Sequence, residues 1–173
     1  MIIFSRYGEY ERRSFIEECF EKYVDVMSKT KLAGELAISS GNNNKPYFKD
    51  YPNIRFSMSH SADLVVLAMA DTEVGIDIEF NKPRDYENVV ERHFFEGEKK
   101  EIVDLSTFYK FWTRKEAFLK FTSEGLSGLS KADVSLELVF NGDKLVFTTL
   151  DIFEGYIGSV VAKEQPIIYV KLD

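Results

Sequence analysis

The chain has a single cysteine among its 173 residues, and this scarcity excludes two kinds of site. Cys19 alone can form neither an intramolecular disulfide nor a paired-cysteine metal centre. It lies in a helical pattern beside Phe15 and Phe20, so we expect it to pack in the core. Histidine is also scarce, with His60 and His93 only, and a metal site built on imidazole and sulfur ligands is therefore not indicated.

Long apolar runs and a positive charge balance are also missing. No apolar run reaches about 18 residues, the minimum for a membrane-spanning helix. The first ten residues lack a charged start followed by a long apolar segment, so we expect no signal peptide and a cytoplasmic protein. The formal net charge of -7 makes nucleic acid an unsuitable partner. An anionic ligand would need a metal ion or a local cluster of cations.

What the chain does contain is a large aromatic and aliphatic fraction. Hydrophobic residues make up 45% of the sequence, including 15 Phe and 9 Tyr, which predicts an aromatic-rich core. The polar, proline-bearing segment 81–85 is the best internal boundary. We therefore predict an α+β fold with an N-terminal half over residues 1–80 and a C-terminal half over residues 81–173, each a helix followed by strands.

Periodicity predicts the individual elements. Helices are expected over 14–27 and 107–121, with further helical pattern between 89 and 109. Strands are expected over 1–6, 32–40, 56–61, 64–70, 74–79, 132–140, 144–151, 156–162 and 167–172. The turn at 71–73 is expected to join two of these strands as a hairpin, and Asn141-Gly142 is a strong hairpin signal for another pair.

Two carboxylates lie within the apolar segment VGIDIE at residues 74–79. Asp77 and Glu79 are two residues apart, so on a strand both side chains point to the same face. Like charges on a mostly buried strand are unfavourable unless a cation or a shared proton lies between them. Oxygen ligands of this kind favour Mg²⁺ over Zn²⁺. The alternative is an edge strand with a solvated acidic face.

A second segment, FWTRKEAFLK at residues 111–120, has helical spacing. Glu116 and Lys120 are four residues apart and share a face, with Trp112 one turn earlier on the same side. An exposed pair of this kind is usually a weak surface ion pair. Here the aromatic surroundings favour the wall of a cleft. Glu116 and Lys120 facing Asp77 and Glu79 would form a site for a phosphorylated ligand, with a metal at the acids and Lys120 at a phosphate oxygen.

Four segments together resemble one known family. In order along the chain, KPYF at 45–48, FSMSHS at 56–61, VGIDIE at 74–79 and WTRKEAFLK at 112–120 resemble the signature segments of the Sfp-type 4'-phosphopantetheinyl transferases. Asn44 stands where glycine is usual. The resemblance implies two pseudo-symmetric α+β halves with coenzyme A in the cleft between them. It also implies a compact member of the family with a short N-terminal portion.

The resemblance implies a role for each matching residue. Asp77, Glu79 and Glu116 would be the Mg²⁺ ligands. Glu116 would also take the proton of the attacking serine, with a metal-bound water as the alternative base. Lys120 would stabilise charge on the phosphate or protonate the leaving group. Lys45, Ser59 and His60 would contact coenzyme A. The further acidic position of the family falls on Glu98, with Glu96 and Glu101 as alternatives.

The implied activity is Mg²⁺-dependent transfer of 4'-phosphopantetheine from coenzyme A to a serine of an acyl or peptidyl carrier protein, with release of adenosine 3',5'-bisphosphate. We expect a monomer that binds the carrier protein near residues 121–131. One alternative is a non-catalytic module that binds coenzyme A or a carrier protein. Another is a Mg²⁺-dependent nuclease, which the acidic net charge and the four-residue spacing of Glu116 and Lys120 disfavour.

Overall fold

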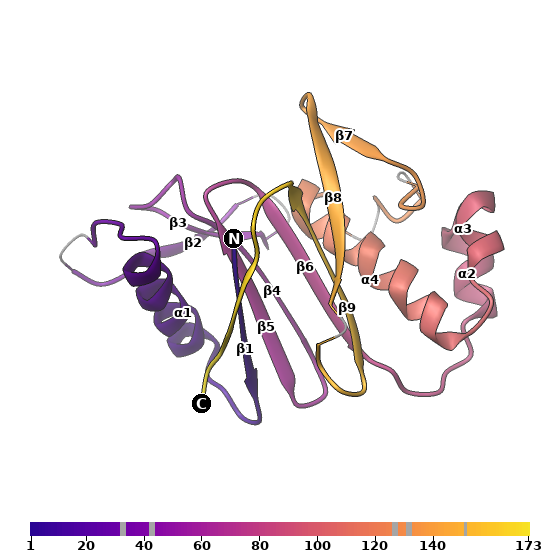
Figure 1. The fold of residues 1–173 in the computed structure, drawn as a ribbon, viewed down its shortest axis with the longest axis horizontal. Coiled ribbons are helices and arrows are strands. Elements are labelled where there is room, and N and C mark those ends of the chain that lie inside the picture. The colour runs from indigo at the N-terminus through magenta and orange to yellow at the C-terminus, as the bar shows by residue number, and fades with distance from the viewer. Residues whose placement is uncertain (32–33, 42–43, 126–127, 131–132, 151) are drawn as a thin grey trace.

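The structure is a computed structural model that describes residues 1–31, 34–41, 44–125, 128–130, 133–150 and 152–173. It has an α+β fold in which two four-stranded sheets lie between the helices α1 and α4 (Figure 1). Parts of the segments predicted at 32–40, 121–131, 132–140 and 144–151 fall outside these ranges. Among the described residues, no helix is long and apolar enough to span a lipid bilayer.

The first sheet has the strand order β10-β1-β5-β4. Its strands are β1 (Ile2–Tyr7), β4 (Arg55–Ser61), β5 (Leu64–Ala70) and β10 (Ile168–Lys171). Helix α1 (Arg12–Val26) covers one face of this sheet. Cys19 is fully buried there, which confirms the predicted core position. The small sheet of β2 (Ile38–Ser40) and β3 (Pro46–Phe48) adds Phe48 to the same core.

The second sheet has the order β6-β9-β8-β7. Its strands are β6 (Val74–Phe80), β7 (Leu138–Phe140), β8 (Asp143–Leu150) and β9 (Tyr156–Lys163). The hairpin predicted at Asn141-Gly142 is confirmed, since both residues have positive φ and join β7 to β8. Helix α4 (Leu105–Thr122) covers one face of the sheet, and α2 (Glu87–His93) and α3 (Glu96–Glu101) lie beyond it (Figure 1).

The hairpin predicted at residues 71–73 is wrong. Both edges of β5 are already paired, with β1 and β4, so β6 has no free edge there and instead pairs with β9 in the other sheet. Strands therefore cross the predicted boundary at residues 80 and 81 in both directions. β6 precedes it yet belongs to the second sheet, and β10 follows it yet pairs with β1. The division into halves 1–80 and 81–173 stays a prediction.

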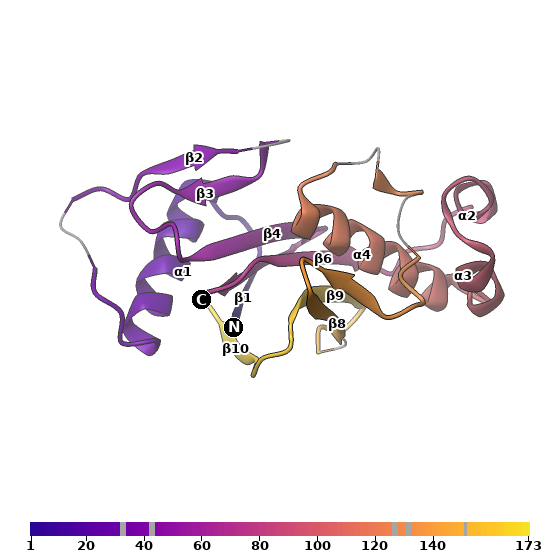
Figure 2. The same ribbon diagram turned by 90° about the horizontal axis from the view of Figure 1, so that it is seen from above.

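The two sheets meet in two ways. Their inner faces pack through apolar side chains such as Ile3 and Val66 of the first sheet and Ile76 and Ile78 of the second. At one margin the edge strands β4 and β6 run side by side, and Figure 2 shows them in that arrangement. Hydrogen bonds of serine hydroxyls on β4 connect these two strands, in place of a ladder of backbone hydrogen bonds.

Candidate functional site

Three serines at alternate positions of β4 form what we call the serine seam: Ser57, Ser59 and Ser61. The Ser57 hydroxyl accepts a hydrogen bond from the Ile76 backbone N–H at 3.2 Å, and the Ser61 hydroxyl accepts one from Phe80 N–H at 3.0 Å. Backbone donors on the edge of β6 are thereby satisfied without a strand partner. The seam fixes how the acidic residues of β6 lie against the first sheet.

Asp77 is at the centre of the site and is only 6% exposed. Its Oδ1 accepts hydrogen bonds from the Ser59 hydroxyl at 2.7 Å and from the Lys120 ammonium at 2.8 Å. Its Oδ2 is buried and has no hydrogen-bond partner among the described residues. A buried carboxylate oxygen without a partner is unfavourable, so Oδ2 is the oxygen of Asp77 that a bound cation would stabilise.

Glu79 occupies the same face of β6. The Ser61 hydroxyl donates to Glu79 Oε2 at 3.0 Å, just as Ser59 donates to Asp77. Because Ser59 and Ser61 also alternate along their strand, the two serine–acid pairs confirm that Asp77 and Glu79 share a face. The period-two reading of VGIDIE is thus correct in geometry, and the solvated-strand alternative does not describe the buried Asp77.

A glycine in β6 determines where helix α4 lies. A Cβ atom built on Gly75 would be 1.9 Å from the Ala117 carbonyl oxygen and 2.7 Å from the Phe121 nitrogen, so only glycine permits this approach. Glu116 and Lys120 immediately precede the two contacted residues, Ala117 and Phe121, in the helix. Gly75, Ser57 and Ser61 were not among the predicted site residues, and Ser59 was predicted only to contact coenzyme A. A lone glycine inside a strand pattern was the available signal for a close backbone approach.

Glu116 is largely buried, and its environment disfavours a negative charge. Burial raises the pKa of its carboxyl to about 7, with further contributions from the negative charges of Asp77 and Glu79, while Lys120 acts in the opposite direction. The three acids predicted to act together are therefore electrostatic neighbours. A carboxyl with a pKa near neutrality can accept and release a proton at physiological pH.

Glu116 and Lys120 line a cleft of about 250 Å³, together with residues of α1, β3 and β4. Lys45 lies on the same cleft. Its ammonium pairs with Glu73 and donates to the carbonyl oxygens of Val74 at 3.3 Å and Phe121 at 3.2 Å. Lys45 thus links the segment before β3 to the start of β6 and the end of α4. Its predicted contact with the nucleotide stays a prediction.

His60 lies apart from this cluster. It is exposed on β4, where neighbouring side chains point to opposite faces, and its ring centroid is 6.4 Å from that of Tyr10 in an edge-on contact. Ser59, the preceding residue, is turned inward to Asp77. The predicted coenzyme A contact of His60 stays a prediction.

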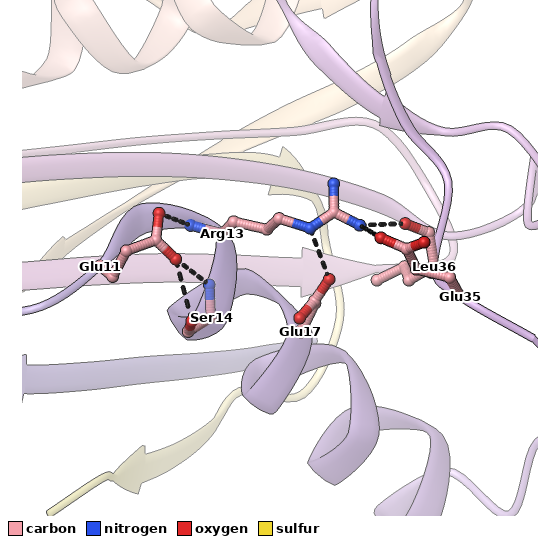
Figure 3. A network of polar contacts seen from close by, with 6 residues as sticks. All are labelled: Glu11, Arg13, Ser14, Glu17, Glu35 and Leu36. Atoms are coloured by element: carbon pink, nitrogen blue, oxygen red, sulfur yellow. Dashed lines mark hydrogen bonds and ion pairs between the residues drawn. The ribbon is translucent and has the colours of Figure 1, made fainter.

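The two arginines at the start of α1 differ in their surroundings. Arg13 pairs with Glu17 at 2.8 Å and with Glu35 at 2.7 Å, and it donates to the Leu36 carbonyl oxygen, so it fastens the segment before β2 to α1 (Figure 3). Arg12, by contrast, lines both the 250 Å³ cleft and an adjoining cavity of about 430 Å³. Arg12 is therefore the arginine placed to meet an anion in the cleft.

Glu98 is the buried member of the three candidates for the further acidic position. It is fully buried and pairs with Lys115 at 2.9 Å, and it accepts hydrogen bonds from the backbone of Phe95 and Val134. Glu96, in contrast, is exposed and pairs with Lys99. Glu98 thereby links α3, α4 and the chain before β7.

The donor set of the site is compatible with a hard divalent cation. Asp77, Glu79 and Glu116 offer oxygen ligands only, and Asp77 Oδ2 is buried without a partner. As the side chains of the described residues stand, no three acids, histidines or cysteines are close enough together to hold a metal ion. The cation that Asp77 contacts in the structure is the Lys120 ammonium, 2.8 Å from Oδ1.

Comparison with known proteins identifies relatives of this sequence. The sequence model of the 4'-phosphopantetheinyl transferase superfamily matches residues 73–155, which include β6 and α4 with their acids and Lys120. The chain belongs to the 4'-phosphopantetheinyl transferase superfamily. The family predicted from the four segments is thus confirmed.

Curated members of the superfamily align with 54–69% of this chain. The 4'-phosphopantetheinyl transferase psf-1 of Bacillus pumilus is 38% identical over 126 residues, which cover 69% of this chain and 54% of the relative. Sfp of Bacillus subtilis is 34% identical over 99 residues, covering 54% and 44%, and HetI of a Nostoc species is 30% identical over 114 residues, covering 60% and 48%. The chain spans about half the length of the curated relatives it matches.

Proposed function

We propose that this member of the superfamily transfers the 4'-phosphopantetheine group of coenzyme A to a serine of an acyl or peptidyl carrier protein. The observation that carries the proposal is the grouping of a buried Asp77, an electrostatically coupled Glu116 and Lys120 beside a cleft. Relatives at 30–38% identity are named 4'-phosphopantetheinyl transferases, which supports the same reaction.

In this reaction the serine oxygen forms a bond to the phosphorus that carries pantetheine. The bond from that phosphorus to the bridging diphosphate oxygen breaks, and adenosine 3',5'-bisphosphate leaves with the electron pair. Glu116 accepts the serine proton, because a hydroxyl is a poor nucleophile until a base removes its proton. Lys120 donates a hydrogen bond to an oxygen of the phosphate under attack, where negative charge increases.

Asp77, Glu79 and Glu116 would hold Mg²⁺, which when bound would neutralise the diphosphate charge. Ser59 and Ser61 orient the carboxylates of Asp77 and Glu79 toward the site through hydroxyl hydrogen bonds. Arg12 lines the cleft and would balance the remaining phosphate charge of coenzyme A. Because α1, β4, β6 and α4 each contribute side chains, one chain supplies the whole site, and we propose that it acts as a monomer.

The test is transfer to an apo carrier protein in the presence of coenzyme A and Mg²⁺, followed by mass spectrometry. The carrier is expected to gain the mass of one phosphopantetheine. Glu116→Gln and Asp77→Asn are expected to abolish the gain, whereas Glu96→Gln, at an exposed acid of α3, serves as the matched control. No transfer to any of several carriers would count against the proposal, and tight binding of coenzyme A without transfer would support a binding module instead.

A further inference from the structure

The carboxylate of Asp77 is paired with one cation in the structure, the ammonium of Lys120. Lys120 Nζ lies 2.8 Å from Asp77 Oδ1 and 3.3 Å from the Met58 carbonyl oxygen. Asp77 is buried, and its other oxygen has no partner in the described part of the chain. Removing Lys120 from this position would leave a buried, uncompensated carboxylate, which is strongly unfavourable. The ammonium therefore supplies the positive charge that the acids require.

We propose that Lys120 is the counter-ion of Asp77 in the metal-free protein and that a divalent cation replaces it, which releases the Lys120 ammonium into the cleft to meet an anionic ligand. The inference rests on the proposed function for the divalent cation and for the identity of that ligand. Two cations cannot share one small carboxylate site at low cost, since like charges at contact distance repel strongly away from bulk water.

Two lysines of α4 pair with acids of other elements, and the two lysines differ in exposure. The Lys115 side chain is 2% exposed, pairs with a fully buried Glu98 and donates to the Leu129 carbonyl oxygen. The Lys120 side chain is 31% exposed and lines the cleft. Rotation of the Lys120 side chain alone would release it, because the contact of Gly75 with Ala117 fixes the helix backbone.

This exchange couples the two ligands of the site. An anion that draws Lys120 away from Asp77 leaves the carboxylate free for a metal ion, and a bound metal ion frees Lys120 for an anion. By linkage, each ligand raises the affinity for the other by the same factor. The coupling depends on the charge of one side chain, so it can be removed by a single substitution.

The experiment titrates the protein with Mg²⁺ alone and follows binding by calorimetry and by fluorescence of Trp112, the sole tryptophan, one helical turn from Glu116. Lys120→Met is expected to bind Mg²⁺ about tenfold more tightly than the unmodified protein, and Lys120→Arg about equally. Lys29→Met, which breaks a pair with Asp71 at 3.0 Å remote from the site, is the matched control and should leave the affinity unchanged.

Equal or weaker Mg²⁺ binding by Lys120→Met, or no binding by either protein, would overturn the inference. A second measurement uses the unmodified chain and does not depend on how the variant folds. Acylation of Lys120 by a lysine reagent, read by mass spectrometry against Lys29, should increase when Mg²⁺ is added, and an unchanged or smaller yield would also overturn it. Neither measurement contains a carrier protein, so each is independent of phosphopantetheine transfer. A protein without transfer activity can still show the exchange of Lys120 for Mg²⁺, and a protein with transfer activity can still lack it.

Discussion

Gly75→Ala tests whether one missing side chain sets the geometry of the site. The added Cβ would be 1.9 Å from the Ala117 carbonyl oxygen, and ordinary contact begins at 3.4 Å, so strand and helix must separate by about 1.5 Å. Overpacking typically costs about 1–3 kcal/mol of stability. A displacement of about 1 Å between reacting groups can lower a rate about 100-fold. We expect both effects, because Glu116 adjoins Ala117 and Asp77 follows Gly75 by two residues.

The measurements are urea denaturation and the rate of phosphopantetheine transfer to a carrier protein. Gly41→Ala is the matched control, since a Cβ at Gly41 meets Lys45 O at 3.5 Å and the Tyr47 ring at 3.7 Å, which are ordinary contacts. A Gly75→Ala protein with unchanged stability and unchanged transfer rate would refute the argument. Lost transfer with unchanged stability would show that the helix moves as a body without loosening the core.

Three further predictions follow from the contacts described. Burial raises the pKa of Glu116 from 4.5 in the unfolded chain to about 7 in the folded protein. Between pH 4.5 and about 7 the folded state therefore binds more protons than the unfolded state. The metal-free protein should lose stability as the pH rises through this range. Glu116→Gln should flatten this pH dependence in urea unfolding, and an identical slope would contradict it. Ser61→Ala removes the hydrogen bond to the Glu79 carboxylate and should slow transfer about tenfold, since a hydrogen bond to a charged group contributes about 1.5–3 kcal/mol. Ser61→Thr keeps a hydroxyl and should restore the rate. A Ser61→Ala enzyme as fast as the parent would exclude a role of Ser61 in orienting Glu79. Glu98→Gln and Lys115→Met should each lower the free energy of unfolding by about 3–5 kcal/mol in chemical denaturation, because each single change leaves a buried charge without its partner. The double variant should lose less than the sum of the two single losses, and full additivity would disprove the coupling of the two residues.

Local periodicity predicted the elements that carry the site. The alternation of Asp77 and Glu79 and the four-residue spacing of Glu116 and Lys120 depend on geometry within one strand and one helix. Both patterns correspond to observed elements, β6 and α4. The helix predicted over 107–121 is two residues longer at its start and one at its end, where Asp104 caps it and Ser123 adopts a left-handed conformation.

Partners distant in the sequence could not be predicted in the same way. The wrong hairpin at residues 71–73 is an example. The local sequence does not indicate that both edges of β5 are paired, with β1 and with β4. The ammonium of Lys45 pairs with Glu73, 28 residues further on, and no local pattern indicates that pairing. The predicted contact of Lys45 with coenzyme A stays a prediction. The roles of Gly75 and the serine seam also depend on which element lies opposite, and a strand pattern does not contain that information.

The serine seam has a consequence for metal preference. A backbone ladder holds neighbouring strands at a nearly constant separation of about 4.8 Å. Between β4 and β6 the separation instead depends on the size of three side chains, so it can change without any shift in pairing register. Substitutions at positions 57, 59 and 61 would widen or narrow the gap beneath the acids, and a wider gap suits larger cations such as Ca²⁺ over Mg²⁺. In the proposed metal site, ion-size selectivity would thus vary at residues that need not touch the ion.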